Sequence, residues 1–436
     1  MARKVQVSTG IEHWGFAMVA AASLCRAAIC LVAAVQATTT VKPTHNSTAG
    51  TTAAGTTAAA GLGTTAKTGH GGNVTKKEVS YFVVDTYNHR VMEWKDCAKE
   101  GKLKAGGHGQ GSKLTHLKFP VDIAIDSHHS NSLVIVDREN HRVVDWPNGA
   151  TQGTLIVGSD QAEKGKSPHD LSFPNGVTID SNGHIIVADT GNHRILRCKR
   201  GHRDCTVVVS GKHYNKDEKS HGCGSYDLHS PEDVEVTAAG KYIITDKYYD
   251  RVLQCEVNGT DGHSHGHIIA GGKTEKGEKC KKDCYGKKLH ELYYPEGTAI
   301  DEHGNYIVAD AYNNRIMKWA PSASQGERKV GKEDKYGSTL SLLHFPRGVV
   351  VDQGDYVIAD AMNHRILRWH PGADKGHLVA GGHGFGSKEK QLHLPDAVAV
   401  LHHSTTAPTC PPVSTASPTS LVMPVVLVCM AFASVS

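Results

Sequence analysis

Residues 189–194 read DTGNHR, so an acid, an amide, an imidazole and a guanidinium fall within six positions. Residue types of this kind could form a catalytic cluster or could stabilise a turn. The rest of the chain distinguishes the two possibilities, because the stretch recurs. The other copies are DTYNHR (85–90), DRENHR (137–142), DKYYDR (246–251), DAYNNR (310–315) and DAMNHR (360–365).

This sixfold recurrence indicates a structural role. A catalytic acid is needed once, whereas each copy carries an Asp at its first position and an Arg at its last. Asp can accept backbone N–H bonds across a turn, and Arg can pair with a carboxylate while lying over a neighbouring repeat. These residues are Asp85, Asp137, Asp189, Asp246, Asp310 and Asp360, with Arg90, Arg142, Arg194, Arg251, Arg315 and Arg365. The His at the fifth position is replaced in two copies, so we interpret it as optional.

Short β-branched runs flank each copy, for example HIIVAD before residue 190 and RILRC after residue 193. Two short strands around a polar turn predict a β-hairpin. A second motif recurs in phase, as in FPNGVTID (173–180), with Pro where a strand can begin. A fourth apolar run closes each unit. Four strands in about 50 residues, repeated, are typical of a β-propeller.

The order of these elements predicts how the ring closes. The domain opens with a second strand, VSYFVVD (79–85), and ends with a first strand, LPDAVAV (394–400). The two ends would complete one blade between them. We therefore predict an all-β fold, a six-bladed β-propeller over residues 79–401, whose ring is closed by N-terminal strands plus a C-terminal strand.

The unit D-x-x-N-H-R-[IV], followed by F-P-x-G-[IV]-x-[IV]-D, resembles the NHL repeat. The resemblance covers the whole predicted propeller, and it implies a six-bladed ring. Blade 4 departs most, with Tyr249 and Asp250 where Asn and His are expected.

The flanking segments are typical of the secretory pathway. Residues 1–37 indicate a signal peptide, with an uncleaved signal anchor as the alternative. Residues 38–78, rich in Thr, Ala and Gly, predict a disordered stalk. A Ser/Thr/Pro stalk at 402–420 precedes an apolar tail at 421–436, the order of a GPI-attachment signal or a short membrane anchor. We expect a secreted or GPI-anchored, surface-tethered glycoprotein.

Sequons and cysteines fit that compartment. Asn46, Asn73 and Asn258 are N-glycosylation acceptors. Cys198 and Cys205 flank a tight turn and are predicted to pair, and Cys280 could pair with Cys284. Cys223 with Cys255 is one option among several, because connectivity does not follow from sequence.

Two groups of residues could bind metals. His263, His265 and His267 would share one face of an extended segment and could hold Zn²⁺ or Cu²⁺, although a His-rich solvent-facing strand is the simpler interpretation. The residues after each strand-leading Pro should lie near the mouth of the central channel. Asn175, Glu232, Glu296 and Asp396 could hold Ca²⁺ there, while Val121 and Arg347 favour ordinary polar lining.

Three functional classes follow from these features. The first is a monomeric, non-enzymatic module that presents loops to a protein, peptide or glycan, with no cofactor. The second is a Ca²⁺- or Zn²⁺-dependent lyase or hydrolase. DREN (137–140) resembles a stretch of the peptidyl-α-hydroxyglycine amidating lyases, but this sequence lacks their zinc-binding His after Pro. The third is a cytosolic NHL module that binds RNA or protein in ubiquitin ligation. The mixed charge, 48 Lys plus Arg against 44 Asp plus Glu, does not favour a nucleic-acid partner.

Overall fold

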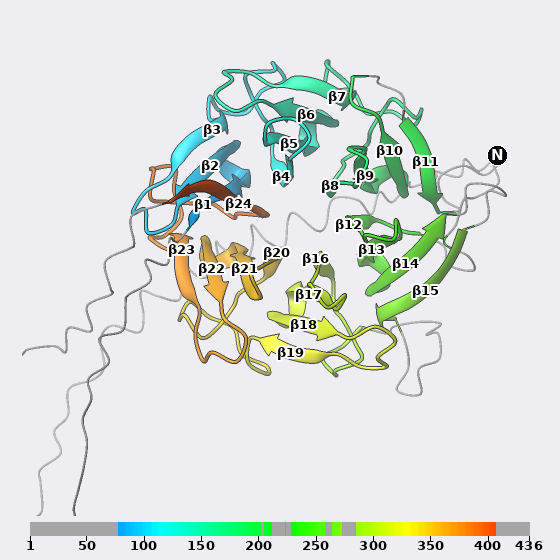
Figure 1. Cartoon of the computed structure of the whole chain (residues 1–436), viewed down its shortest axis with the longest axis vertical. Coiled ribbons are helices and arrows are strands. Elements are labelled where there is room, and N and C mark those ends of the chain that lie inside the picture. Colours follow the sequence, from blue (N-terminus) through cyan, green and yellow to red (C-terminus); the bar gives the residue numbers. More distant parts are fainter. Residues whose placement is uncertain are drawn as a thin grey trace, which may run out of the picture. The chain divides into compact units, whose positions relative to one another are not determined.

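The computed structural model describes residues 77–201, 205–211, 223, 228–257, 264–272 and 285–406. In these ranges the chain forms 24 strands in six four-stranded antiparallel sheets. The sheets are arranged radially around a common centre (Figure 1). The prediction of an all-β, six-bladed propeller is therefore confirmed.

Each sheet is one blade, and its strands follow one another from the centre of the ring outwards. Blade 1 contains β24 (Val398–Thr406), β1 (Lys77–Asp85), β2 (Arg90–Lys95) and β3 (Lys102–Gly106). Blade 2 contains β4 (Pro120–Asp126), β5 (Ser132–Asp137), β6 (Arg142–Trp146) and β7 (Thr154–Gly158). Blade 3 contains β8 (Val177–Ile179), β9 (Ile185–Asp189), β10 (Arg194–Cys198) and β11 (Cys205–Ser210).

The second half of the ring repeats this order. Blade 4 contains β12 (Pro231–Val236), β13 (Tyr242–Asp246), β14 (Arg251–Val257) and β15 (Ser264–Gly271). Blade 5 contains β16 (Pro295–Ile300), β17 (Tyr306–Asp310), β18 (Arg315–Trp319) and β19 (Glu327–Val330). Blade 6 contains β20 (Pro346–Asp352), β21 (Asp355–Asp360), β22 (Arg365–Trp369) and β23 (His377–Gly381).

The ring closes through blade 1, as the order of elements predicts. β24 pairs antiparallel with β1, and Tyr81 lies opposite Val400. The Arg90 side chain also donates hydrogen bonds to the backbone carbonyls of Ser387 and Gln391, some 300 positions along the chain. Both ends of the described chain thus hold the same blade together.

The core consists of six hydrophobic clusters, each built from two neighbouring blades. Between blades 2 and 3, for example, Val136 and Val143 pack with Val187 and Leu196. All six residues of β5 are buried, because both faces of a blade are covered. This explains why the middle strands read as continuous apolar runs instead of alternating ones. Each buried Val or Ile side chain contributes about 1.5–3 kcal/mol.

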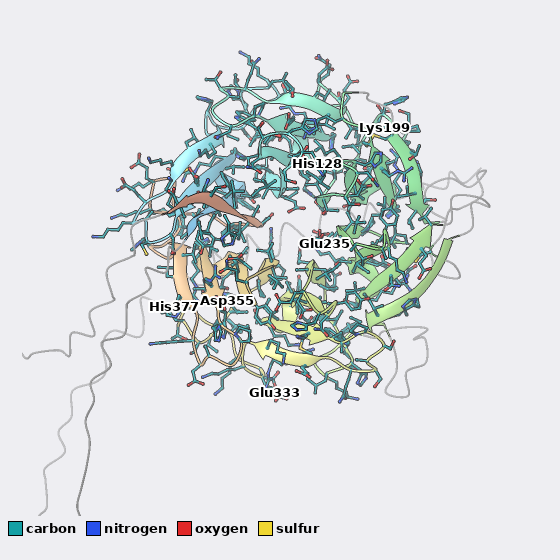
Figure 2. All side chains as sticks on the ribbon, viewed as in Figure 1. His128, Lys199, Glu235, Glu333, Asp355 and His377 are labelled. Carbon is teal, nitrogen blue, oxygen red and sulfur yellow. A yellow bond between two sulfur atoms is a disulfide. The ribbon has the colours of Figure 1, made fainter. Side chains whose placement is uncertain are left out.

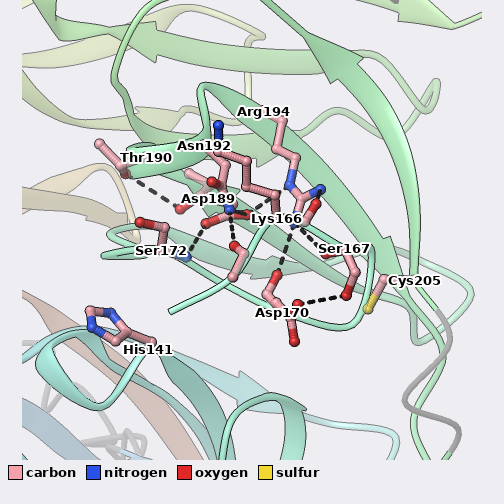
Figure 3. A network of polar contacts seen from close by, with 12 residues as sticks. His141, Lys166, Ser167, Asp170, Ser172, Asp189, Thr190, Asn192, Arg194 and Cys205 are labelled. Atoms are coloured by element: carbon pink, nitrogen blue, oxygen red, sulfur yellow. Dashed lines mark hydrogen bonds and ion pairs between the residues drawn. The ribbon is translucent and has the colours of Figure 1, made fainter. Parts of the chain in front are cut away.

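The recurring six-residue stretches form one-turn 3-10 helices between the second and third strands. They are η1 (Thr86–Asn88), η2 (Arg138–Asn140), η3 (Thr190–Asn192), η4 (Lys247–Tyr249), η5 (Ala311–Asn313) and η6 (Ala361–Asn363). Figure 3 shows the polar network at η3. Asp189 Oδ2 accepts hydrogen bonds from Arg194 Nε at 2.7 Å and from Asn192 Nδ2 at 2.8 Å. Asp189 Oδ1 accepts the backbone N–H of Ser172 at 2.7 Å.

The same Arg anchors the loop that enters its own blade. Arg194 donates to the backbone carbonyls of Lys166, Ser167 and Asp170 at 2.7–2.8 Å. Neither Asp189 nor Arg194 is exposed. Burial raises the pKa of Asp189, while the adjacent guanidinium opposes the shift. Equivalent Asp–Arg pairs occur in all six blades: Asp85–Arg90, Asp137–Arg142, Asp189–Arg194, Asp246–Arg251, Asp310–Arg315 and Asp360–Arg365.

The fifth position of the stretch has a role that the interpretation as optional missed. The residue there adopts a left-handed backbone in every blade, with φ between 48° and 55°. Its side chain then accepts a backbone N–H from the residue before the next strand-leading Pro. His141 Nδ1 accepts from Phe173, Asp250 Oδ1 from Tyr294, and Asn314 Oδ1 from Phe345. His, Asn and Asp all tolerate this backbone, and each supplies an acceptor, so the three are interchangeable at this position.

We call these six fifth-position residues the inter-blade latches. They are His89, His141, His193, Asp250, Asn314 and His364, and each connects one blade to the next.

Tryptophan and cysteine share one slot at the end of the third strand. A Cβ on Gly101 or Gly326 would lie 2.6–2.7 Å from the indole of Trp94 or Trp319, so glycine lets the indole approach the backbone just before the fourth strand. In blades 3 and 4 the structure has disulfides at this slot, Cys198–Cys205 and Cys223–Cys255. Cys97 is also disulfide-bonded. The predicted Cys280–Cys284 pair lies outside the described residues.

Replacing Asp189 with Ala should strongly destabilise the propeller. The substitution leaves the Arg194 guanidinium buried without its carboxylate, so we expect the free energy of unfolding to fall by about 3–5 kcal/mol. Urea unfolding followed by tryptophan fluorescence measures this change. The control is Glu302→Ala, at an exposed side chain on the opposite face, which should change stability by less than about 0.5 kcal/mol. Equal effects of the two substitutions would contradict the structural role of Asp189.

The latch histidines should make the fold sensitive to acid. Burial, aided by His393 and His344, lowers the pKa of His364 from 6.5 to about 4. The unfolded chain therefore takes up the proton first, and stability is lost progressively as the pH falls from about 6.5 towards about 4.

The matched variant is His364→Asn, which retains both the acceptor and the tolerance for the left-handed backbone, as Asn314 does in blade 5. We expect a smaller decrease in Tm between pH 7 and pH 4 than in the unmodified chain, and a larger decrease for Asn314→His. Identical pH profiles of Tm in all three proteins would show that the latches do not titrate.

Candidate binding face and channel mouth

The loops and turns of interest share one side of the ring. Neighbouring strands run antiparallel, so the second and fourth strands of each blade end on the same side. That side carries the six 3-10 turns and the loops that connect successive blades. We call it the upper face. The described parts of the inter-blade loops are residues 107–119, 159–176, 211, 223, 228–230, 272, 285–294, 331–345 and 382–397.

The residues after each strand-leading Pro lie where the innermost strands begin, at the upper end of the channel. The structure brings Glu232 and Glu296 together around one cation, because Lys247 Nζ lies 3.3 Å from Glu232 Oε1 and 2.6 Å from Glu296 Oε1. Arg347 forms an ion pair with Asp396. Asn175 accepts a hydrogen bond from Arg138 Nε at 2.7 Å.

Sequence analysis did not predict two residues of this channel-mouth network, Arg138 and Lys247. Both follow the first Asp of a turn, on η2 and η4. The available signal was that a basic residue occupies this position in two of the six copies. Its meaning depends on the distance between separate elements, which spacing along the chain does not give.

The charges at the mouth are largely neutralised. Burial, together with Glu296, raises the pKa of Glu232 to about 7, whereas Lys247 opposes the shift. Burial also acts on Glu296, but Lys247 and Arg347 outweigh it and lower the pKa of that carboxyl. Within the described ranges, no group of three or more His, Cys, Asp or Glu is placed to hold a metal ion. These carboxylates form ion pairs with Lys247 and Arg347, and Ca²⁺ binding at the mouth stays a prediction.

Below the mouth, three further acids join adjacent inner strands. Asp122 Oδ2 accepts the backbone N–H of Val177, and Asp233 Oδ2 accepts that of Thr298, both at 2.7 Å. Glu235, near the centre of the ring in Figure 2, accepts a hydrogen bond from Thr178 Oγ1 at 3.1 Å.

Burial explains the titration of these acids. It raises the pKa of Asp233 to about 6, and burial together with Asp233 raises that of Glu235 to about 8. Sequence analysis missed all three acids. The signal was an acid on an inner strand where other blades have Gly, Ala, Thr or Val.

The His-rich segment lies partly on β15, the outermost strand of blade 4. His267 pairs with Gln254 and is exposed, and His265 pairs with Glu256. His263 and the sequon at Asn258 lie outside the described residues, as do Asn46 and Asn73. Gly266 lies opposite Cys255, where a Cβ would come within 1.9 Å of Cys223 Sγ. Gly266 therefore leaves room for the Cys223–Cys255 disulfide. Metal binding by the three histidines stays a prediction.

An arc of tyrosines covers part of the upper face. Tyr248 and Tyr249 lie on η4, Tyr312 lies on η5, and the others come from the loops before blades 5 and 6. Ring centroids of successive members lie 4.9 Å apart in the pairs Tyr285–Tyr293, Tyr293–Tyr312 and Tyr294–Tyr312. We define the tyrosine arc as Tyr248, Tyr249, Tyr285, Tyr293, Tyr294, Tyr312 and Tyr336.

These rings are unusually accessible for aromatic side chains. Tyr248 is 58% exposed, Tyr285 50%, Tyr312 47% and Tyr336 51%. The turns of blades 2 and 3 carry Glu139 and Gly191 at the position that Tyr248 and Tyr312 occupy. Among the described residues, the exposed tyrosines of this face thus lie on the turns of blades 4 and 5 and in the loops before blades 5 and 6, and none lies on blades 2 and 3. Sequence analysis missed the arc because DKYYDR, DAYNNR and LYYP each show tyrosines without indicating that they converge.

Comparisons with known proteins agree with the fold. A family model for the NHL repeat matches residues 171–198, 292–319 and 343–369, which lie in blades 3, 5 and 6 and the loops before them. A chain of the nidogen/laminin complex superposes with a TM-score of 0.50 at 15% identity, and the match covers 74% of this chain and 98% of that one. This likeness concerns the fold alone.

Two curated relatives match shorter segments. Probable peptidyl-alpha-hydroxyglycine alpha-amidating lyase pgal-1 of Caenorhabditis elegans is 25% identical over 160 residues, 36% of this chain and 40% of the relative. NHL repeat-containing protein 2 of Bos taurus is 44% identical over 84 residues, 19% of this chain and 11% of the relative. The chain therefore spans less than half the length of either relative. With its three repeat matches and its six-bladed ring, the chain is a β-propeller that contains NHL repeats.

Proposed function

We propose that this propeller is a non-enzymatic binding module that docks a protein partner on the tyrosine arc. The supporting observation is the gathering of exposed tyrosines on one part of one face. Tyrosine offers a large, rigid contact area with a polar tip, and it is enriched among the residues that dominate protein interfaces. Exposed aromatic clusters of this kind mark interaction sites on otherwise polar surfaces.

The backbone beneath the arc is already ordered. The N–H of Tyr293 donates to Asp310 Oδ1 at 2.8 Å, and the N–H of Tyr294 donates to Asp250 Oδ1 at 2.7 Å. The N–H of Tyr312 donates to the carbonyl of Tyr293 at 3.2 Å. A partner would therefore meet a preorganised surface, and little conformational entropy would be lost on binding.

The likeness to the amidating lyase makes a zinc-dependent reaction the second candidate, but the residues at the mouth do not fit it. No His follows any of the six strand-leading prolines, and the carboxylates present are already paired with Lys247 and Arg347. A site for Zn²⁺ needs uncommitted nitrogen, sulfur or oxygen ligands. We therefore favour binding over catalysis.

The disulfides Cys198–Cys205 and Cys223–Cys255 favour an oxidising compartment and argue against a cytosolic module. Among the described residues, no helix is long and apolar enough to cross a membrane. A GPI tether is our proposal from the composition of residues 402–436.

Phosphatidylinositol-specific phospholipase C tests the tether on cells that express the full chain. We expect release of a product whose mass falls after treatment with N-glycosidase. A chain that keeps its mass and stays with the cells would contradict both the glycosylation and the anchor.

Photo-cross-linking tests the docking face directly. We expect p-benzoylphenylalanine in place of Tyr312 or Tyr336 to cross-link the same discrete protein on intact cells, because both positions lie in the arc. The matched control is the same substitution at His303, an exposed residue on the opposite face, which should give no such product. Cross-linking at His303 but not at Tyr312 would place the interface elsewhere.

A further inference from the structure

We propose that the tyrosine arc together with Asp250 accepts a basic side chain, Lys or Arg, from the partner protein. This inference rests on the proposed binding function and names the chemistry of the partner. It starts from the departure of blade 4 from the repeat, DKYYDR, which places Tyr249 and Asp250 where the other blades have Asn followed by His or Asn.

Asp250 carries a charge that its structural task does not require. As the latch of blade 4, it needs only an acceptor and a left-handed backbone, and the neutral Asn314 supplies both in blade 5. The other four latches are histidines. An ionised carboxylate at this position incurs a desolvation cost that Asn avoids. The negative charge of Asp250 is therefore not needed for the latch.

This carboxylate also lacks a counter-charge. Asp250 is only 8% exposed, and it forms no ion pair with any residue that the structure describes. The groups that act on it are the N–H of Tyr294 and the like-charged Asp310, and burial with Asp310 raises its pKa to about 6. By contrast, Asp246 and Asp310 nearby are each paired with an Arg. An incoming cation would supply the missing partner.

The tyrosines around Asp250 suit such a cation. Asp250 acts electrostatically on both Tyr293 and Tyr294, so these rings lie close to it. Lys and Arg bind favourably over aromatic faces. The upper face already uses this contact, because the guanidinium of Arg251 lies 4.6 Å from the centroid of Tyr249 and that of Arg347 lies 5.6 Å from that of Phe345.

The arc retains aromatic faces for a further cation. No Lys or Arg of the described chain lies over Tyr248 or Tyr312, and both rings are about half exposed; the imidazole of His229 packs on one side of Tyr248, with ring centroids 4.1 Å apart. The adjacent mouth is close to neutral, because Lys247 and Arg347 pair with its carboxylates. The carboxylate of Asp250, which has no ion pair among the described residues, therefore complements a basic side chain and would repel an acidic one.

A selection from a phage-displayed library of random short peptides tests this inference on the full chain at neutral pH. We expect the selected peptides to share an Arg or Lys, and their affinity to fall about tenfold for Asp250→Asn. Asn should preserve the latch, which an unchanged Tm would verify. The control is Glu139→Gln, which removes one negative charge from the turn of blade 2, outside the tyrosine arc, and should leave the affinity for the peptides unchanged.

The possible outcomes distinguish failure of this inference from failure of the proposed docking on the tyrosine arc. Peptides without a shared basic residue, or equal affinity for the wild type and Asp250→Asn, would overturn the inference. In that case, loss of binding to these peptides in the Tyr312→Ala variant would still support the arc as the binding face. If Tyr312→Ala bound them equally well, or if no peptide were selected, both proposals would fail.

Discussion

The buried Asp–Arg pair at each turn is the interaction on which the rest of the propeller depends. In blade 3, the carboxylate of Asp189 accepts hydrogen bonds from the backbone of Ser172 and from Arg194. Arg194 in turn donates hydrogen bonds to the loop that enters the same blade. A lone buried guanidinium or carboxylate would be very costly, so the two residues must occur together. The latches then join each blade to the next. Together these contacts order the loops of the upper face, including the backbone that carries the tyrosine arc.

The proposed binding surface lies where the repeat is broken. The six turns share their Asp and Arg, but blade 4 alone combines Lys247, Tyr248, Tyr249 and Asp250. Lys247 reaches the channel mouth, whereas the two tyrosines belong to the arc and Asp250 accepts a hydrogen bond from the backbone of Tyr294 within it. A repeated scaffold lets one unit diverge because the remaining contacts are retained in every blade. Departures from local consistency are the expected place for functional residues.

Sequence analysis predicted the fold well because the fold rests on short-range, repeated signals. The hairpins, the strand-leading prolines and the Cys198–Cys205 disulfide follow from neighbouring residues, and the closure through blade 1 follows from the order of the repeated elements. The mouth and the arc were not predicted, since the pairing of Lys247 with Glu296 and the stacking of Tyr285 on Tyr293 depend on loop conformation. The latches were misread because His, Asn and Asp look dissimilar until the left-handed backbone shows what they share.

The central claim is that the tyrosine arc is covered by a partner on the cell. Tyrosine footprinting with a diazonium reagent and mass spectrometry tests it on the unmodified chain, by comparing intact cells with the purified protein. We predict that Tyr248, Tyr285, Tyr312 and Tyr336 are labelled in the purified chain, where they are exposed, and protected on cells. Equal labelling of these four tyrosines in both states would contradict the account.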